Sequence, residues 1–215
     1  MKNKKAIILM MILVGVLFSF SNLTLAAETE TGAINDLMPW QGTNQAFIKL
    51  FDTPASAEFF SAVADYAEGY DSQAVRQAFA ELYNASFSEM EVVDAKTVIF
   101  DQQLKAEYDY LGNLNTSWGE YSISWYIFKT ADQAAIAAGF KYLMFVPYHQ
   151  DGEDGLRHCH MRYGNPNFDY LATDPSLANW WPTLFEKGQV NKEKIVKNMV
   201  KQARLYSTML PVKTK

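Results

Sequence analysis

The chain has 215 residues, with 19 basic and 24 acidic side chains, and its net charge is −5. It lacks the basic excess that nucleic-acid binding requires, so we expect no nucleic-acid partner. A single cysteine excludes an internal disulfide, so the fold must be held by its core, by a metal ion or by both.

Residues 1–27 have the order of a secretory signal peptide. Three lysines precede an almost wholly apolar stretch, Ala6 to Phe20, and small residues close the segment at Ala26 and Ala27. The stretch is shorter than the roughly 20 residues that a membrane-spanning helix needs. We therefore predict cleavage, export to the periplasm or the extracellular space, and no stable membrane insertion. The mature chain, residues 28–215, then has 16 basic and 24 acidic residues and a net charge of −8.

Residues 28–86 predict a helical N-terminal part. Apolar residues between Ala33 and Asn84 recur at helical spacing. Pro54 follows Asp-Thr as at a typical helix start, and Ser72 offers an N-cap for a helix that ends near Leu82.

Residues 87–215 have a different pattern: short segments in which apolar and polar residues alternate, as is typical of strands. Strands are predicted at Met90–Val93, Thr97–Phe100, Lys105–Tyr110, Tyr121–Lys129, Tyr142–Val146 and Cys159–Tyr163. Gly112-Asn113 indicates a turn, and the alanine-rich stretch at 131–139 a helical or loop insertion. Asn191 to Tyr206 predicts an amphipathic helix. The mature chain is thus predicted to be one mainly β domain, an antiparallel sheet or barrel with N-terminal and C-terminal helices.

All three histidines lie in one short stretch, at His149, His158 and His160. His158 and His160 are two residues apart, and on a strand such residues point to the same face. His149 can reach this pair from the end of the preceding strand, across the loop from Asp151 to Leu156. The sequence therefore predicts that three imidazoles converge on one point.

Three imidazoles are a suitable donor set for Zn²⁺, which prefers nitrogen or sulfur ligands in a tetrahedron, with Zn–N near roughly 2.0–2.1 Å. A fourth position stays open for water or a carboxylate. The same three imidazoles can also bind Cd²⁺, Cu²⁺, Ni²⁺ or Co²⁺. The sequence thus predicts a divalent-metal site made by His149, His158 and His160.

Two neighbouring features allow two interpretations each. Cys159 could supply a fourth, thiolate ligand, or it could be a small buried core residue; we favour the core because free cysteine is usually buried. The acidic loop at residues 151–154 could attract cations, but such runs are more often solvated turns.

The C-terminal half resembles the ZinT (YodA) family of exported zinc- and cadmium-binding proteins. The likeness rests on a histidine, a nine-residue step and an H-x-H pair, followed by the segments 161–165 (Met-Arg-Tyr-Gly-Asn) and 179–183 (Asn-Trp-Trp-Pro-Thr). Upstream, Ala80 to Leu111 resembles the first strands of the family, and the Trp-Gln-Gly at 40–42 its mature start.

The resemblance implies a calycin-like (lipocalin-like) barrel with added helices. It further implies zinc capture outside the cytoplasm and delivery to an uptake system, with a zinc-uptake solute-binding protein as partner. The chain departs from the family in lacking a histidine-rich N-terminus, in having Cys159 where the family usually has an aromatic residue, and in its alanine-rich stretch.

We expect a metal-binding protein and not an enzyme, because the sequence reveals no general base and no substrate cleft. One alternative is a zinc-dependent hydrolase with Glu153 or Asp154 as base. A second is a lipocalin-type carrier of an apolar molecule, whose pocket would be lined by the aromatic residues around Trp180 and Trp181. Those aromatics also suit an ordinary core, which we favour.

Overall fold

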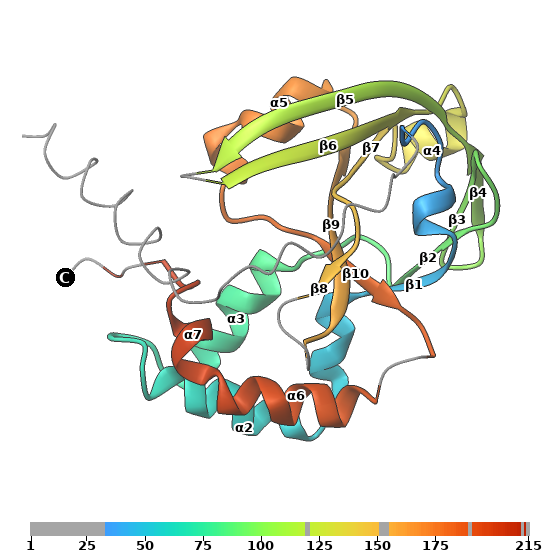
Figure 1. Cartoon of the computed structure of the whole chain (residues 1–215). Coiled ribbons are helices and arrows are strands. Elements are labelled where there is room, and N and C mark those ends of the chain that lie inside the picture. Colours follow the sequence, from blue (N-terminus) through green and yellow to red (C-terminus); the bar gives the residue numbers. More distant parts are fainter. Residues whose placement is uncertain (1–32, 119–120, 151–154, 189–190, 212, 214–215) are drawn as a thin grey trace, which may run out of the picture.

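The computed structural model describes residues 33–118, 121–150, 155–188, 191–211 and 213 (Figure 1). The predicted signal peptide and its cleavage point lie outside these ranges. Among the described residues, no helix combines the length and apolarity needed to cross a membrane.

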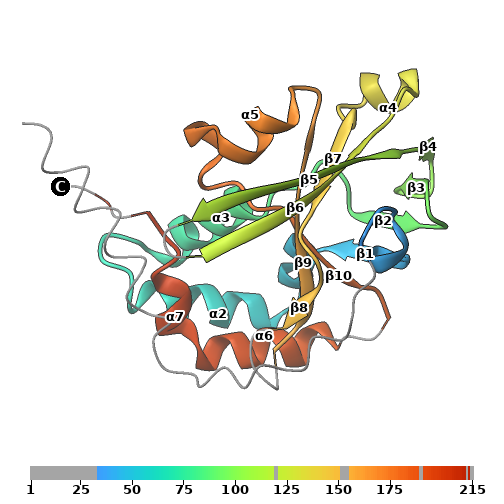
Figure 2. The same ribbon diagram turned by 45° about the horizontal axis from the view of Figure 1, so that its top comes forward.

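Ten antiparallel strands form one sheet in the order β4-β3-β2-β1-β10-β9-β7-β6-β5, with β8 paired to β9 off this path. The edge strands β4 and β5 are consecutive in the chain and separated only by Tyr108, so the sheet curls into a half-barrel (Figures 1 and 2). The predicted calycin-like, mainly β fold is confirmed. The strands are β1 (Gly42–Ala46), β2 (Glu89–Val92), β3 (Thr97–Phe100), β4 (Leu104–Glu107), β5 (Asp109–Trp118), β6 (Tyr121–Lys129), β7 (Tyr142–Phe145), β8 (His149–Gln150), β9 (Arg157–Gly164) and β10 (Thr183–Glu186).

Aromatic side chains fill the inside of the curl. The ring of Trp40 packs 5.0 Å from that of Phe145 and 5.9 Å from that of Phe128. The indole N–H of Trp40 is satisfied by the Val146 carbonyl at 3.2 Å. Each such buried ring stabilises the fold by about 1.5–3 kcal/mol.

Helices form a second layer on one side of the sheet (Figure 1). They are η2 (Phe47–Asp52), α2 (Ala55–Ala64), α3 (Ser72–Leu82), α6 (Lys192–Lys201) and α7 (Ala203–Ser207). Their apolar faces share one cluster that includes Phe59, Phe79 and Val196. The helix predicted to end near Leu82 is confirmed, but its N-cap is Asp71, whose carboxylate accepts from the Ala74 N–H at 2.7 Å, and not Ser72.

Short helices complete the fold: η1 (Met38–Trp40), α4 (Gln133–Ala137), α5 (Phe168–Thr173) and η3 (Pro175–Leu177). α4 lies in the alanine-rich insertion, as predicted. The predicted C-terminal helix is confirmed in two pieces, α6 and α7, because the backbone leaves helical geometry at Gln202. α5 packs through Leu171 against the outer face of β6 and β7 (Figure 2).

Three strand features differ from the sequence prediction. β1 lies in the part predicted to be helical, yet it pairs with β2 on one side and β10 on the other. Gly112 is not in a turn but forms a bulge inside β5, where its φ of +135° suits only glycine. β10 was not predicted at all, and it is the strand that flanks β9 beside the histidines.

Candidate metal centre

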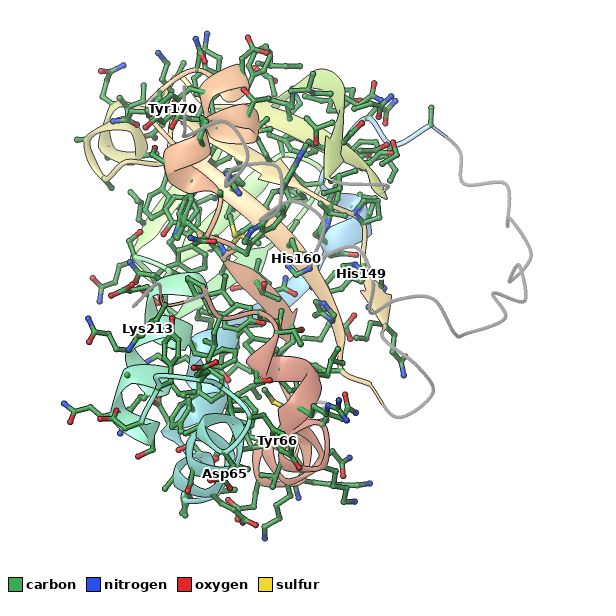
Figure 3. The ribbon with its side chains drawn as sticks, turned by 90° about the vertical axis from the view of Figure 1, so that its left-hand side faces the viewer. Asp65, Tyr66, His149, His160, Tyr170 and Lys213 are labelled. Carbon is green, nitrogen blue, oxygen red and sulfur yellow. The ribbon has the colours of Figure 1, made fainter. Side chains whose placement is uncertain are left out.

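Strands β8 and β9 bring the three predicted ligands together. His149 lies directly opposite His158 in the antiparallel register, and His160 follows on the same face of β9. The ring centroids of His149 and His158 are 4.3 Å apart, and each lies 5.1 Å from that of His160. One nitrogen from each ring lies within 4.8 Å of the other two. Figure 3 shows His149 and His160 facing each other from neighbouring strands.

Backbone carbonyls set the tautomers of His149 and His158. Nδ1 of His149 is 3.2 Å from the Pro147 carbonyl oxygen, and Nδ1 of His158 is 2.7 Å from that of Leu156. A carbonyl oxygen can only accept, so each Nδ1 must carry the proton. Each Nε2 then carries the lone pair that a metal ion requires.

A hydroxyl sets the tautomer of His160. Its Nδ1 is 2.8 Å from Oγ1 of Thr183, the residue paired with it on β10. The single proton of that hydroxyl is donated to the Trp181 carbonyl at 2.9 Å, so Oγ1 must accept from the imidazole. His160 therefore also presents Nε2 as its unprotonated nitrogen.

Burial and charge keep His160 neutral. Burial is the main cause that holds the pKa of this imidazole well below its ordinary value, and electrostatic interaction with His158, His149 and Arg162 lowers it further. A neutral ring is the form that binds a metal ion. The environment thus removes the proton that would compete with a cation at His160.

No family model matches the chain, and no curated protein matches it in sequence. Solved structures do match it. The Zn(II)-bound ZinT-like domain of Streptococcus pneumoniae AdcA aligns over 81% of this chain and 94% of its own, with a TM-score of 0.58 and 17% identity. Zn(II)-bound AdcA from Streptococcus pneumoniae aligns over 79% of this chain with a TM-score of 0.59 and 18% identity.

The chain has the ZinT-like fold. The resemblance to the ZinT family that the sequence indicated is confirmed at the level of the fold. The chain spans 36% of the length of whole AdcA, so it corresponds to the ZinT-like part of that protein.

One wall of the histidine cluster is aromatic and cationic. The ring of Trp181 lies 5.7 Å from that of His160, with its plane nearly perpendicular. The guanidinium of Arg162 stacks 4.7 Å from the Trp181 ring and donates to the carbonyls of Leu171 and Leu177 at 2.8 and 2.9 Å. Arg162 thereby holds the segment that carries Trp181 and Thr183 against β9.

Cys159 lies on the opposite face of β9 from the histidines. It is fully buried in the interior core, as predicted, and is not a fourth ligand among the described residues. Burial raises the pKa of its thiol to about 12, so the sulfur stays protonated.

The acidic loop lies outside the described residues, at 151–154. This range includes Glu153 and Asp154, the bases that a hydrolase would need. The non-enzymatic interpretation therefore remains a prediction.

Sequence reasoning found the three histidines but missed the role of Thr183. The residue belongs to the family-like Trp-Pro-Thr stretch, yet it lies 23 positions from His160 in the chain. Only the pairing of β9 with β10 brings the hydroxyl to the ring. A β-branched residue with a hydroxyl at the start of a strand was the available signal, and it is a common one.

Proposed function

We propose that this protein binds Zn²⁺ through Nε2 of His149, His158 and His160. One observation carries the proposal: each Nδ1 faces an acceptor, and one nitrogen of each ring lies within 4.8 Å of those of the other two. Ligating histidines usually donate their other ring N–H to such acceptors, which fixes the ring and raises its basicity.

The donor set supports zinc over harder ions. Mg²⁺ and Ca²⁺ prefer oxygen ligands, whereas imidazole suits Zn²⁺ and related ions. The two solved ZinT-like relatives are Zn(II)-bound, which supports the same assignment. Cd²⁺ is expected to bind at the same three nitrogens.

We propose further that the protein works outside the cytoplasm and supports zinc uptake by capturing the ion. The signal-peptide order of residues 1–27 and the resemblance to the ZinT family support this role. A zinc-uptake solute-binding protein is the expected recipient. We propose no catalytic step, and zinc-dependent turnover of ester or peptide substrates that ceases on chelation would contradict this.

Calorimetric titration of the protein with zinc tests the site. The wild type should bind one ion tightly, and a variant with both His158→Ala and His160→Ala should lose that binding. Gln150→Ala, an exposed change beside His149 on β8, is the matched control and should bind like the wild type. Equal binding by wild type and the double variant would remove the triad as the site.

A further inference from the structure

A buried hydrogen-bond chain lies behind the histidines, on the other face of β8 and β9. The hydroxyl of Tyr148 is bonded to Oδ1 of Asn44 on β1 and to the thiol of Cys159 on β9. Asn44 and Cys159 are both fully buried. Tyr148 precedes His149, and Cys159 lies between His158 and His160. The hydrogen bonds therefore connect the two segments that carry the ligands.

Each polar atom in this chain has a defined role. Nδ2 of Asn44 donates to the carbonyls of Trp40 and Gly42 at 3.0 and 3.1 Å. Its Oδ1 therefore faces Tyr148 and accepts the hydroxyl proton. The buried sulfur of Cys159 is the second hydrogen-bonding partner of this hydroxyl.

The ring of Tyr148 is held as well as its hydroxyl. The guanidinium of Arg157 lies 4.2 Å from the ring centroid. Arg157 is in turn paired with Glu186 on β10. Side chains from β1, β9 and β10 thus fix a tyrosine that belongs to the short segment before β8.

His149 needs such an anchor because its own strand is minimal. β8 has two residues, His149 and Gln150, and its register with β9 consists of two residue pairs. His158 and His160 are fixed by β9, which is paired with β7 and β10. His149 is therefore the ligand with the least backbone support, and Tyr148 is its immediate neighbour.

We propose that the Tyr148 hydroxyl, held by Asn44 and Cys159, is a positioning group that fixes His149 against the His158–His160 pair and thereby sets zinc affinity and coordination geometry. This inference rests on the proposed zinc site.

The test compares Tyr148→Phe with Tyr108→Phe. Both changes remove one hydroxyl from a tyrosine that packs in the same core; that of Tyr108 donates to the Phe140 carbonyl at 2.8 Å. Tyr148→Phe should weaken zinc binding about tenfold or more, as removal of outer-shell partners typically does. It should also change the visible absorption of bound Co²⁺, which reports coordination geometry. Tyr108→Phe should alter neither.

A second pair of variants tests the hydrogen-bonding partner at position 159. Cys159→Ser keeps a partner for the Tyr148 hydroxyl and should bind zinc nearly as the wild type does, whereas Cys159→Ala should resemble Tyr148→Phe. Wild-type affinity and Co²⁺ spectrum in Tyr148→Phe would overturn the inference and leave the zinc site standing. Equal weakening by Tyr148→Phe and Tyr108→Phe would also overturn it, because the cause would be general loosening of the core. A wild type that binds no zinc would overturn the proposed function itself.

Discussion

The two faces of strand β9 differ completely in what they do. One face carries Cys159 and Met161, both fully buried in the aromatic interior of the half-barrel. The other carries His158, His160 and Arg162, which face His149 and Trp181. Neighbouring residues along the same backbone therefore belong to two separate environments, one apolar and one polar.

This difference shows how a strand can combine a rigid support with a metal site. The alternation of side chains places packing residues and ligands one position apart without mixing them. Changes at interior residues that only pack, outside the Tyr148 hydrogen-bond chain, should therefore alter stability and leave zinc affinity nearly intact, and changes on the histidine face should do the reverse. The predictions below test that separation.

The largest expected effect is on the interior face. Met161→Ala should lower the free energy of unfolding by about 2–5 kcal/mol, because it leaves a cavity among tightly packed rings. Zinc affinity of the folded protein should stay within about threefold of wild type, since affinity changes in the metal shell arise from ligand partners. Denaturant unfolding and calorimetry measure the two quantities. A large loss of affinity would show that core packing as such, and not only the Tyr148 hydroxyl, sets zinc affinity.

Zinc itself should stabilise the fold through the histidine face. At free zinc about 1,000 times Kd, binding should add about 4 kcal/mol to the free energy of unfolding, because an ion that binds only the folded state shifts the equilibrium. A chelator should reverse the shift in melting temperature. The double variant His158→Ala with His160→Ala should show no zinc-dependent shift, and one that persists there would place the ion elsewhere.

The sequence predicted the histidine face well for a simple reason. Two histidines at i and i+2 on a strand must share a face, and the strand itself was visible from its alternating pattern. His149 was assigned by its distance along the chain, and the structure brings it directly opposite His158. The buried position of Cys159 follows from the same alternation.

The elements that the sequence did not predict depend on long-range pairing. β1 consists of Gly, Thr, Asn, Gln and Ala, of which only Thr favours strands, and it is a strand because β2 and β10 pair with it on both sides. β10 has no pattern of its own beyond four residues, yet it delivers Thr183 to His160. Contacts between distant segments are not encoded in local periodicity, so the outer shell of the site was not visible from the sequence.

Thr183 offers a smaller and more specific test of the histidine face. Thr183→Val keeps the shape but removes the acceptor for the His160 Nδ1–H, so zinc should bind about tenfold more weakly, equivalent to about 1.4 kcal/mol. Thr130→Val is the matched control, because Thr130 is also buried and its hydroxyl accepts one bond, from the Asp132 N–H at 3.0 Å. Calorimetric Kd values compare the two variants. Equal values for Thr183→Val and wild type would mean that the hydroxyl does not orient the ring.

The last prediction concerns pH, and it distinguishes His160 from an ordinary histidine. Zinc Kd should rise as pH falls from about 7 to about 5, because protons compete for imidazole nitrogens whose ordinary pKa is near 6.5. The pKa of His160 is already well below that value, mainly through burial, so this ring remains neutral to lower pH than an exposed one. His160 is therefore protonated to a smaller extent than the other two rings. Zinc binding then displaces fewer than three protons, so log Kd should change by less than three per pH unit even at about pH 5. Calorimetry in buffers of different ionisation enthalpy counts the protons released per zinc ion. Three protons released at about pH 5 would mean that burial does not protect His160, and that packing against Trp181 and Thr183 does not shield this face of β9 from solvent.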